Sequence, residues 1–440
     1  MALGGGTFLV QNKVLPGSYI NFVSASRASA TLTDRGVATM PLELDWGPDG
    51  EVFTVTNDEF QKDSLKLFGH AYTDDAMKPL RELFANMKTA HLFKLNTSGQ
   101  KASNKYATAK YTGALGNELK IVIEQNEEFV TTENEVYDVS TFLGSSCVDT
   151  QKGVKAVSEL KENDYLTFSG SEALAVTAAL PLTSGSNGTV QDATYQTYLD
   201  KIESYTFNTM GCATTNETVK SLFVAFTKRL RDEVGVKFQT VLFRYEKADY
   251  EGIISVENGL VSDDDAPSMV YWVTGAQAGC EVNKSLTNAT YTGEYDVYVD
   301  YTQAQLEAGI QAGKLMFHRV DDEIHLLTDI NSFTSVTDDK NADFSSNQTM
   351  RVLDQIGNDI ALLFNTKYLG KVPNDNAGRI SLWNDIVTHH NQLQTLRAIE
   401  NFSGENVTVE QGDTKKAVVI TDYVTPVNAM EQLFMTVIVQ

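Results

Sequence analysis

Cysteine is scarce in this chain, which has only Cys147, Cys212 and Cys280 among 440 residues and no C-x-x-C pair. That spacing predicts neither a zinc site nor a disulfide framework, so we expect reduced and mostly buried thiols. The chain also has no run of about 18 apolar residues. Its start, MALGGGTFLV, has no basic segment followed by an apolar one. We therefore expect no membrane span and no leader, and a protein made and kept in a reducing, soluble compartment.

Positive charge is also in short supply. Lysine and arginine number 35 against 58 acidic residues, which gives a formal net charge of -23. A surface so negative is repelled by phosphate backbones and by anionic lipid, so we expect no nucleic-acid partner and no membrane contact. The same charge opposes self-association. Any assembly of copies must therefore depend on backbone pairing, apolar contact or local charge complementarity.

The sequence lacks a recognisable catalytic or nucleotide-binding motif. No G-x-x-x-x-G-K-S/T loop occurs, and the glycines of YTGALGNEL fit no dinucleotide fingerprint, so we interpret them as a turn. Ser186 lies in SGSNG, where the glycines do not have the spacing of the G-x-S-x-G nucleophile elbow. No histidine occurs between Gln191 and Thr302, which disfavours a serine hydrolase in that segment. We predict no catalytic residue, no cofactor and no enzymatic activity.

Two histidine pairs are the remaining candidates for a metal site. In KLMFHRVDDEIHLLTDI, a tight turn at Asp321–Asp322 would place His318 and His325 opposite each other on one face of a hairpin. Two ligands do not make a site, so we interpret them as an ordinary cross-strand pair and predict no metal site. His389 and His390 are adjacent on a predicted helix and point in different directions, so we expect one surface and one core residue.

The length of the chain implies several domains, because single hydrophobic cores stop growing near about 250 to 300 residues. Helical periodicity covers Asn57 to Phe93. Between Ala90 and Ser184 short alternating runs such as HLFKL, ELKIVIE and DYLTFSG are separated by glycine and asparagine turns, which predicts an all-β module. The acidic stretch from Glu124 to Asp138 in this module is interpreted as a solvated strand face.

From Gln191 onward, strands and helices alternate, which indicates an α/β layer with helices covering a largely parallel sheet. Four helices are predicted in this segment. The first carries Tyr195 to Tyr205, the second begins at a capping box at Thr214–Glu217, the third opens at Asp263–Asp265, and the fourth covers Thr302 to Ala312. Two long helices follow, at Gln348–Tyr368 and Ala377–Ile399, and then the strand-like runs VTVEQGD, KKAVVITDYV and LFMTVIVQ. The fold class predicted is multidomain, α/β plus all-β, with an α+β C-terminal part.

Several long stretches carry a resemblance that spans the whole chain. They are GGGTFLVQNKVLPGSYINFVS, LELDWGPDGEVFTV, YATAKYTGALGNELKIVI, VYWVTGAQAGCEVNKSLTNATY, TDINSFTSVTDDKNADFSSNQTMRVLDQIGNDI and VTPVNAMEQLFMTVIVQ. Together they resemble the contractile tail sheath family, in the branch found in myoviruses, defective prophages and R-type tail bacteriocins of Gram-positive bacteria. The similarity depends on many long segments in family order rather than on one short motif.

This resemblance implies a domain organisation. It comprises a subtilisin-like α/β domain without proteolytic function, an inserted β-rich outer domain of barrel or sandwich type, a C-terminal domain facing an inner tube, and strand arms at both ends. On this chain the expected boundaries are 1–24 for the N-terminal arm, 25–90 and 185–330 for the α/β domain, 91–184 for the outer domain, 331–420 for the tube-facing domain and 421–440 for the C-terminal arm.

The resemblance also implies a function. The chain is expected to polymerise around an inner tube in a metastable extended state and to contract, driving the tube through a target cell envelope. Implied partners are other copies in a helical homopolymer, the inner tail tube protein, the baseplate and the tail terminator. Assembly is expected in the cytoplasm of the bacterial host, within a virion tail or a released phage-tail-like particle.

Strand-prone residues near both termini are the candidate links between subunits, since the family adds its arms as strands to sheets of neighbours. The alternatives that stay open are a serine hydrolase on the α/β segment and another structural part of the particle, such as tube or baseplate. The candidate linking residues are Phe8, Leu9, Val10, Val14, Leu433, Phe434, Met435, Val437, Ile438 and Val439.

Overall fold

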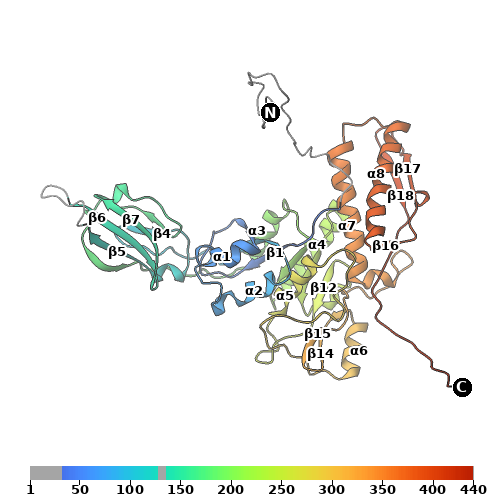
Figure 1. The fold of residues 1–440 in the computed structure, drawn as a ribbon, viewed down its shortest axis with the longest axis horizontal. Coiled ribbons are helices and arrows are strands. Elements are labelled where there is room, and N and C mark those ends of the chain that lie inside the picture. Colours follow the sequence, from blue (N-terminus) through green and yellow to red (C-terminus); the bar gives the residue numbers. More distant parts are fainter. Residues whose placement is uncertain (1–31, 127–134, 440) are drawn as a thin grey trace, which may run out of the picture.

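The computed structural model describes residues 32–126 and 135–439 and shows an elongated molecule (Figure 1). A β-rich module lies at one end, a helix-covered sheet lies in the middle, and two long helices with a small hairpin stand at the other end. The middle sheet is seven-stranded, in the order β13-β12-β11-β10-β1-β3-β2. Its strands are β1 Val37–Leu42, β2 Val52–Thr56, β3 Thr89–Lys94, β10 Thr209–Cys212, β11 Gln239–Phe243, β12 Ile253–Val256 and β13 Lys314–Leu315.

This sheet is parallel except for β2, which pairs antiparallel with β3. Alternate side chains of β11 enter different cores: Val241 packs with helices on one face, and Leu242 packs with helices on the other. The predicted helix-covered, largely parallel sheet is therefore confirmed. The helices are α1 Asn57–Phe68, α2 Lys78–Phe84 and α5 Met269–Gly279 on one face, α3 Asp192–Ile202 and α4 Glu217–Lys228 on the other, and α6 Gln303–Gln311 beside β13.

Several local predictions need correction. The sequence predicts that the run HLFKL belongs to the β module and that the helical pattern extends to Phe93. These residues instead belong to β3 and its end, and β3 lies between β1 and β2 in the middle sheet. Leu92 enters one core and Phe93 the other, so this strand is buried on both faces and shows no alternation that identifies its sheet. At α4, Asn216 rather than Thr214 caps the helix, by accepting from the N–H groups of Thr218 and Val219.

Two helix ends also differ from the prediction. Helix α5 begins at Met269, because the acidic run before it forms turns, and the second long helix ends at Thr395 rather than Ile399. Residues Ile399–Glu400 instead form β16, which pairs with Thr425–Pro426 of β19. A short strand pairing therefore replaces the last predicted helical turn.

The β-rich module has its own core, and the all-β prediction is confirmed. A four-stranded sheet in the order β7-β6-β5-β9 faces the pair β4-β8. Trp46, from the chain before the module, is fully buried in this core against Tyr111 and Tyr165, which ties the module to the middle sheet. The strands are β4 Ala107–Ala109, β5 Leu119–Gln125, β6 Tyr137–Leu143, β7 Ser146–Val154, β8 Leu166–Phe168 and β9 Thr177–Pro181.

The glycines of YTGALGNEL form a turn, as predicted. Gly113 has φ +141°, and a Cβ at this position would lie 1.8 Å from the carbonyl oxygen of Asp45. Only glycine fits such a close backbone approach. Ala114–Glu118 then makes a 3₁₀ turn that leads into β5. The acidic stretch was interpreted as a strand face; residues 127–134 of it lie outside the described residues.

The C-terminal part is built on two long helices (Figure 1). Helix α7, Asn347–Leu363, continues into a π-turn at Phe364–Tyr368, and helix α8, Asn376–Thr395, lies beside it. A hairpin of β17 Val407–Gln411 and β18 Val418–Asp422 packs with α8. A separate hairpin of β14 Phe317–Val320 and β15 Glu323–Leu326 lies below the middle sheet in Figure 1. None of the helices in the described ranges is both long and apolar enough to cross a bilayer.

Helices α2 and α5 pack so closely that glycine is required between them. A Cβ on Gly275 would lie 2.0 Å from the carbonyl oxygen of Leu83, which is backbone and cannot rotate away. We expect Gly275→Ala to destabilise the protein by about 1 to 3 kcal/mol in urea unfolding, because the two helices must move apart. Gly357→Ala is the control, since its Cβ would meet only the flexible side chain of Lys237 at 3.3 Å. That substitution should be neutral or stabilising by about 0.5 to 1 kcal/mol; equal losses in both variants would contradict the packing argument.

Candidate assembly surfaces

The end of the chain leaves the folded body. After β19, residues 427–439 pair with no strand of the described chain and run outward (Figure 1). The strand predicted for LFMTVIVQ is therefore not formed, because no strand of the residues that the structure describes lies beside it to complete a ladder. Its apolar side chains, which belong to Leu433, Phe434, Met435, Val437, Ile438 and Val439, are between 70% and 90% exposed.

The root of this C-terminal segment is nonetheless held by the body. Asn428 bonds the hydroxyls of Ser346 and Thr349 at the start of α7. Glu431 accepts from the hydroxyls of Thr287 at 2.7 Å and Thr328 at 3.0 Å. The free part therefore begins directly after Glu431. An apolar segment held at its root and exposed beyond it has the form of a projecting arm.

The predicted N-terminal linking residues Phe8, Leu9, Val10 and Val14 lie outside the described residues. From Leu32 the chain passes between α7 and the middle domain. Thr33 Oγ1 donates to Asp359 Oδ1 at 2.6 Å, and the Arg35 guanidinium donates to the carbonyls of Gln277 and Cys280. Burial, and then the charge of Arg351, lower the pKa of Arg35 to about 10.

The hairpin of β17 and β18 is a sheet with open edges. These strands pair with each other from Val407↔Asp422 to Gln411↔Val418, and no third described strand joins them. One face packs on α8, where the indole of Trp383 donates to the carbonyl oxygens of Gly404 and Val407. On β18, Val419 and Ile420 stay 52% and 36% exposed. Open strand edges beside exposed apolar residues are templates for pairing with another chain.

Buried charges join α7 to the middle domain. Arg351 donates to Asp329 Oδ2 at 2.6 Å, and both side chains are almost fully buried. Arg231 forms a bidentate pair with Asp354, at 2.7 and 2.8 Å. Burial alone would raise the pKa of Asp329, but the charge of Arg351 and hydrogen bonds from Leu286, Arg351 and Gln277 bring it below its usual value. Breaking such a pair leaves an uncompensated buried charge, so α7 has one favoured position.

The predicted surface and core positions of the adjacent histidines need correction, since both are buried. His389 Nε2 lies 2.9 Å from Asp359 Oδ2 on α7, and His390 Nε2 lies 2.8 Å from Asp422 Oδ2 on β18 without the alignment of a hydrogen bond. The side chains do point toward different elements, as expected. Both are covered because α7 packs on one side of α8 and the hairpin on the other.

His318 and His325 lie opposite each other in the β14–β15 hairpin, as the sequence predicted. His325 Nδ1 contacts the carbonyl oxygen of Asn288, and its Nε2 contacts Glu323. Over the ranges that the structure describes, no group of three or more His, Cys, Asp or Glu side chains is placed to hold a metal ion. Cys212 and Cys280 are buried and Cys147 is exposed. The two imidazoles thus lie on directly paired residues of the β14–β15 ladder.

Ser186 does not lie in a catalytic arrangement. Its backbone exchanges hydrogen bonds with Gln100, at 3.0 and 3.1 Å, within the β-rich end of the molecule. The loop around it packs so closely that a Cβ on Gly99 would lie 2.2 Å from the carbonyl oxygen of Ser186. Ser186 thus lies in a loop closed by backbone pairing and not on the strand-to-helix turn of a nucleophile elbow.

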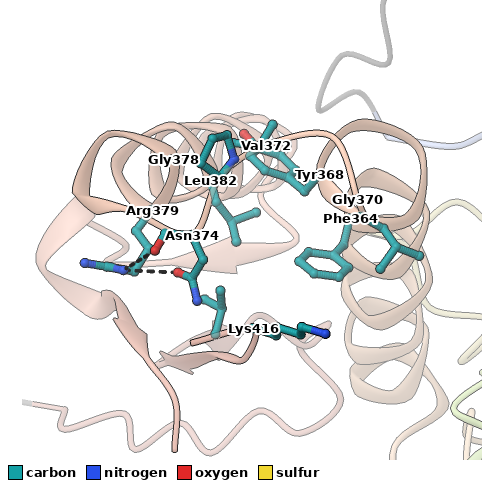
Figure 2. Close-up of a pocket in the computed structure, with 12 residues that line it drawn as sticks. Phe364, Tyr368, Gly370, Val372, Asn374, Gly378, Arg379, Leu382 and Lys416 are labelled. Carbon is teal, nitrogen blue, oxygen red and sulfur yellow. Dashed lines mark hydrogen bonds between the residues drawn. The ribbon is translucent and has the colours of Figure 1, made fainter. Parts of the chain in front are cut away.

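Sequence reasoning missed one surface feature, a pocket at the outer end of α7 and α8 (Figure 2). Phe364 and Leu382 line it from the two helices, and Val418 lines it from β18. Arg379 at its edge donates to the carbonyl and side-chain oxygens of Asn374, at 3.2 and 3.1 Å. The cavity measures about 100 Å³. It is far smaller than the roughly 300 to 1,000 Å³ of small-molecule sites.

The projecting segment and the open strand edges are thus candidate assembly surfaces, and comparison with known proteins identifies the class of the protein. Four models of tail sheath proteins match consecutive parts of the chain. They are the domain III N-terminal region of tail sheath protein Gp18 over 35–95, the beta-sandwich domain over 97–187, the central domain over 188–332 and the C-terminal domain over 339–440.

Similar proteins cover the chain from end to end. The protein XkdK of the phage-like element PBSX of Bacillus subtilis (strain 168) is 30% identical, over 99% of each chain. The crystal structure of a sheath tail protein from Desulfitobacterium hafniense is 37% identical and covers 94% of this chain and 97% of its own, with a TM-score of 0.81. The helical sheath of the anti-feeding prophage in its contracted state shares the fold, with a TM-score of 0.58 at 13% identity over 96% and 98% of the two chains.

The chain belongs to the phage tail sheath family. It is a structural subunit of a contractile tail sheath, in a phage tail or a phage-like particle, and not an enzyme. The resemblance seen in the sequence is confirmed, and so is the multidomain architecture with a β-sandwich domain.

The lowered pKa of Asp329 implies that the stability contributed by its pair with Arg351 depends on pH. A carboxylate whose pKa is lower in the folded than in the unfolded state stabilises the fold at pH values above its unfolded pKa, which is near 4. This stabilisation is lost as the pH falls through the folded pKa. Asp329→Asn leaves Arg351 unpaired and should cost about 3 to 5 kcal/mol at pH 7. The difference from wild type should shrink below about pH 4, because protonation removes the same charge. Urea unfolding between pH 7 and 3 measures this. A difference that does not vary with pH would contradict it.

Proposed function

We propose that this subunit links to its neighbours by donating strands. The observation that supports the proposal is the apolar segment from Leu433 to Val439, which projects from the body with its side chains exposed. An extended segment can add to the edge of another sheet, where main-chain hydrogen bonds supply affinity and alternate side chains enter pockets. The predicted N-terminal strand at Phe8, Leu9, Val10 and Val14 acts in the same way.

The hairpin of β17 and β18 is the acceptor in this proposal. Its edges are open in the described chain, and it lies in the same part of the molecule as the root of the C-terminal arm (Figure 1). Each added hydrogen bond contributes about 1 kcal/mol net, so an arm with several bonds holds with several kcal/mol. Donor and acceptor on every copy give a head-to-tail contact, which builds a helical homopolymer where the rotation does not close.

This connection suits a sheath that contracts. The arms keep copies joined while the folded bodies rotate from one packing to another, so a metastable lattice around an inner tube releases free energy without nucleotide hydrolysis. The released energy drives the tube through the target envelope. The tube protein, the baseplate and the tail terminator are the further partners, and assembly takes place in the cytoplasm of the bacterial host.

The domain roles follow the same proposal. In this proposal the middle α/β domain is subtilisin-like, and its largely parallel sheet covered by helices on both faces supports that assignment. We assign it to 25–90 and 185–330, the outer domain to 91–184, the tube-facing domain to 331–420, and the arms to 1–24 and 421–440. The boundaries between the matched family segments, at 35–95, 97–187, 188–332 and 339–440, fall close to these proposed boundaries.

Proline substitutions test the C-terminal strand. Proline removes one ladder donor, so at least one of Val437→Pro and Thr436→Pro should abolish formation of sedimentable polymer by the purified chain while the melting temperature stays within a few degrees of wild type. Val437→Thr keeps the N–H and a branched side chain, and should assemble. Thr436→Pro adds a test of register: if the strand pairs on one side only, one of the two prolines is tolerated, whereas a strand held on both sides tolerates neither. Normal assembly of both proline variants would refute the proposal.

Deletion of residues 1–18 tests the N-terminal arm. The truncated chain should stay folded and monomeric, because the arm serves neighbours rather than its own core. Its melting curve should remain cooperative, while sedimentation should show no polymer. Loss of the cooperative transition would mean that the segment is a core strand of its own subunit.

A further inference from the structure

We propose that a protonated histidine, His390, holds the hairpin of β17 and β18 on α8, and that loss of this proton releases the hairpin. The contacts involved lie within one copy of the chain. The inference therefore goes beyond strand donation and does not depend on it. The helices α7 and α8 and the hairpin that these contacts join lie together in the C-terminal part (Figure 1).

Two adjacent histidines on α8 each face a carboxylate on a different element. His389 Nε2 lies 2.9 Å from Oδ2 of Asp359 on α7, and His390 Nε2 lies 2.8 Å from Oδ2 of Asp422 at the end of β18. The side chains of both histidines are buried, and their Nδ1 atoms lie 3.3 Å apart. Ionisable groups from three elements therefore meet in one cluster.

The oxygen atoms around His390 determine its protonation. Its Nδ1 lies 2.9 Å from the backbone carbonyl of Ile386, an oxygen that can only accept a hydrogen bond. Its Nε2 lies against the carboxylate of Asp422. A neutral imidazole carries a single N–H, so its other nitrogen would place a lone pair against one of these oxygens. Both contacts are favourable only if His390 is an imidazolium, with a proton on each nitrogen.

His389 needs only one proton. Its Nε2 donates to Asp359, which also accepts from the hydroxyl of Thr33 and the amide of Gln355. Its Nδ1 faces the protonated Nδ1 of His390, so a lone pair on His389 fits this contact. A second proton on His389 would bring two N–H groups face to face. The two histidines are adjacent and equally covered, yet only His390 carries a charge.

The charges that face the two histidines come from α7, from β18 and from the chain that precedes β1. Helix α7 contributes Asp359, whose carboxylate also interacts with the charge of Arg35. Strand β18 contributes Asp422, which pairs with His390. The ring of Phe402 lies beside His390, with centroids 4.9 Å apart, and brings no charge. Asp422 therefore depends on His390 for a counter-charge, whereas Asp359 has a second cation.

Charge rather than an aligned hydrogen bond holds Asp422 at His390. His390 Nε2 and Asp422 Oδ1 are buried, and neither has a hydrogen-bond partner in the parts of the chain that the structure describes. Opposite charges attract at any angle, whereas a nitrogen lone pair and a carboxylate repel each other. Without the proton, Asp422 would be a covered and uncompensated charge, so its side chain, already 22% exposed, turns to water. Because Asp422 pairs with Val407 across the ladder, this end of the hairpin lifts with it.

The sign of the pH dependence follows from this arrangement. An imidazole in water loses its proton near pH 6.5. Below that value His390 is protonated whether the hairpin is seated or lifted, so pH has little effect on the balance. Above it, lifting the hairpin releases one proton, and the balance shifts toward the lifted state by up to about tenfold per pH unit. The hairpin and its open strand edges are therefore fixed on α8 at mildly acidic pH and released at alkaline pH.

Nitrogen-15 spectra of the histidine rings report the protons directly. The chain has 6 histidines, and the spectra of His389→Gln and His390→Gln assign the two rings of the cluster. At about pH 7, His390 should carry a proton on both nitrogens and His389 on Nε2 alone. A single proton on His390, or two on His389, overturns the inference.

Hydrogen–deuterium exchange tests the release of the hairpin. It is measured between about pH 6 and pH 8.5, on the fraction of the purified chain that sediments as a monomer. After correction for the intrinsic effect of pH on exchange, the amides of β17 and β18 should lose protection by about tenfold or more across this range, while those of the middle sheet keep theirs. An unchanged hairpin, or an equal loss in both parts, overturns the inference.

Matched substitutions identify the group that titrates. His390→Gln and Asp422→Asn each remove one charge of the pair, so the hairpin should exchange equally at both ends of the pH range, near the wild-type alkaline rate. His389→Gln keeps a donor toward Asp359, and Glu410→Gln removes an exposed carboxylate of the same hairpin, so both should retain the pH dependence. Wild-type protection of the middle sheet shows that each variant is folded. Loss of the pH dependence in either control, or its retention in His390→Gln or Asp422→Asn, overturns the inference.

Discussion

The buried ion pairs of α7 are the interactions on which the rest of the arrangement depends. Arg351 with Asp329, and Asp354 with Arg231, place fully desolvated charges between the middle domain and the C-terminal helices. Charges in such surroundings cost several kcal/mol if either partner is lost, whereas apolar packing tolerates small shifts. The two domains are therefore fixed as one body, and the hairpin, the pocket and the root of the arm are held at defined positions on it.

Under the strand-donation proposal, assembly uses the opposite kind of surface. The arm from Leu433 to Val439 and the edges of the hairpin expose apolar side chains and unpaired backbone, groups that a single chain normally covers. A net charge of -23 opposes non-specific approach of such copies, so their contact depends on these directional groups.

Hydrophobic periodicity predicted which segments form helices and strands better than it predicted which elements pack beside them. The helices, the parallel sheet and the separate β module follow from residue patterns, but β3 could not be assigned to the middle sheet, because a strand buried on both faces has no alternation and its partners are distant in sequence. The histidines of α8 were misplaced for a related reason: burial depends on what packs against a helix, and α8 is covered on two sides. The pocket left no signal at all, since its lining comes from three separate elements.

The predicted terminal strand shows what such patterns can mean in a subunit of an assembly. Alternation in LFMTVIVQ predicts a strand, yet among the described residues the segment forms none and remains exposed. A strand is stable only with a partner for its backbone groups, so strand propensity without a partner in the same chain indicates that the partner lies in another. The energy that holds the fold then comes from within each copy, while the energy that joins copies comes from groups the fold does not use. Under the strand-donation proposal, that separation would allow the bodies to change their packing during contraction without unfolding.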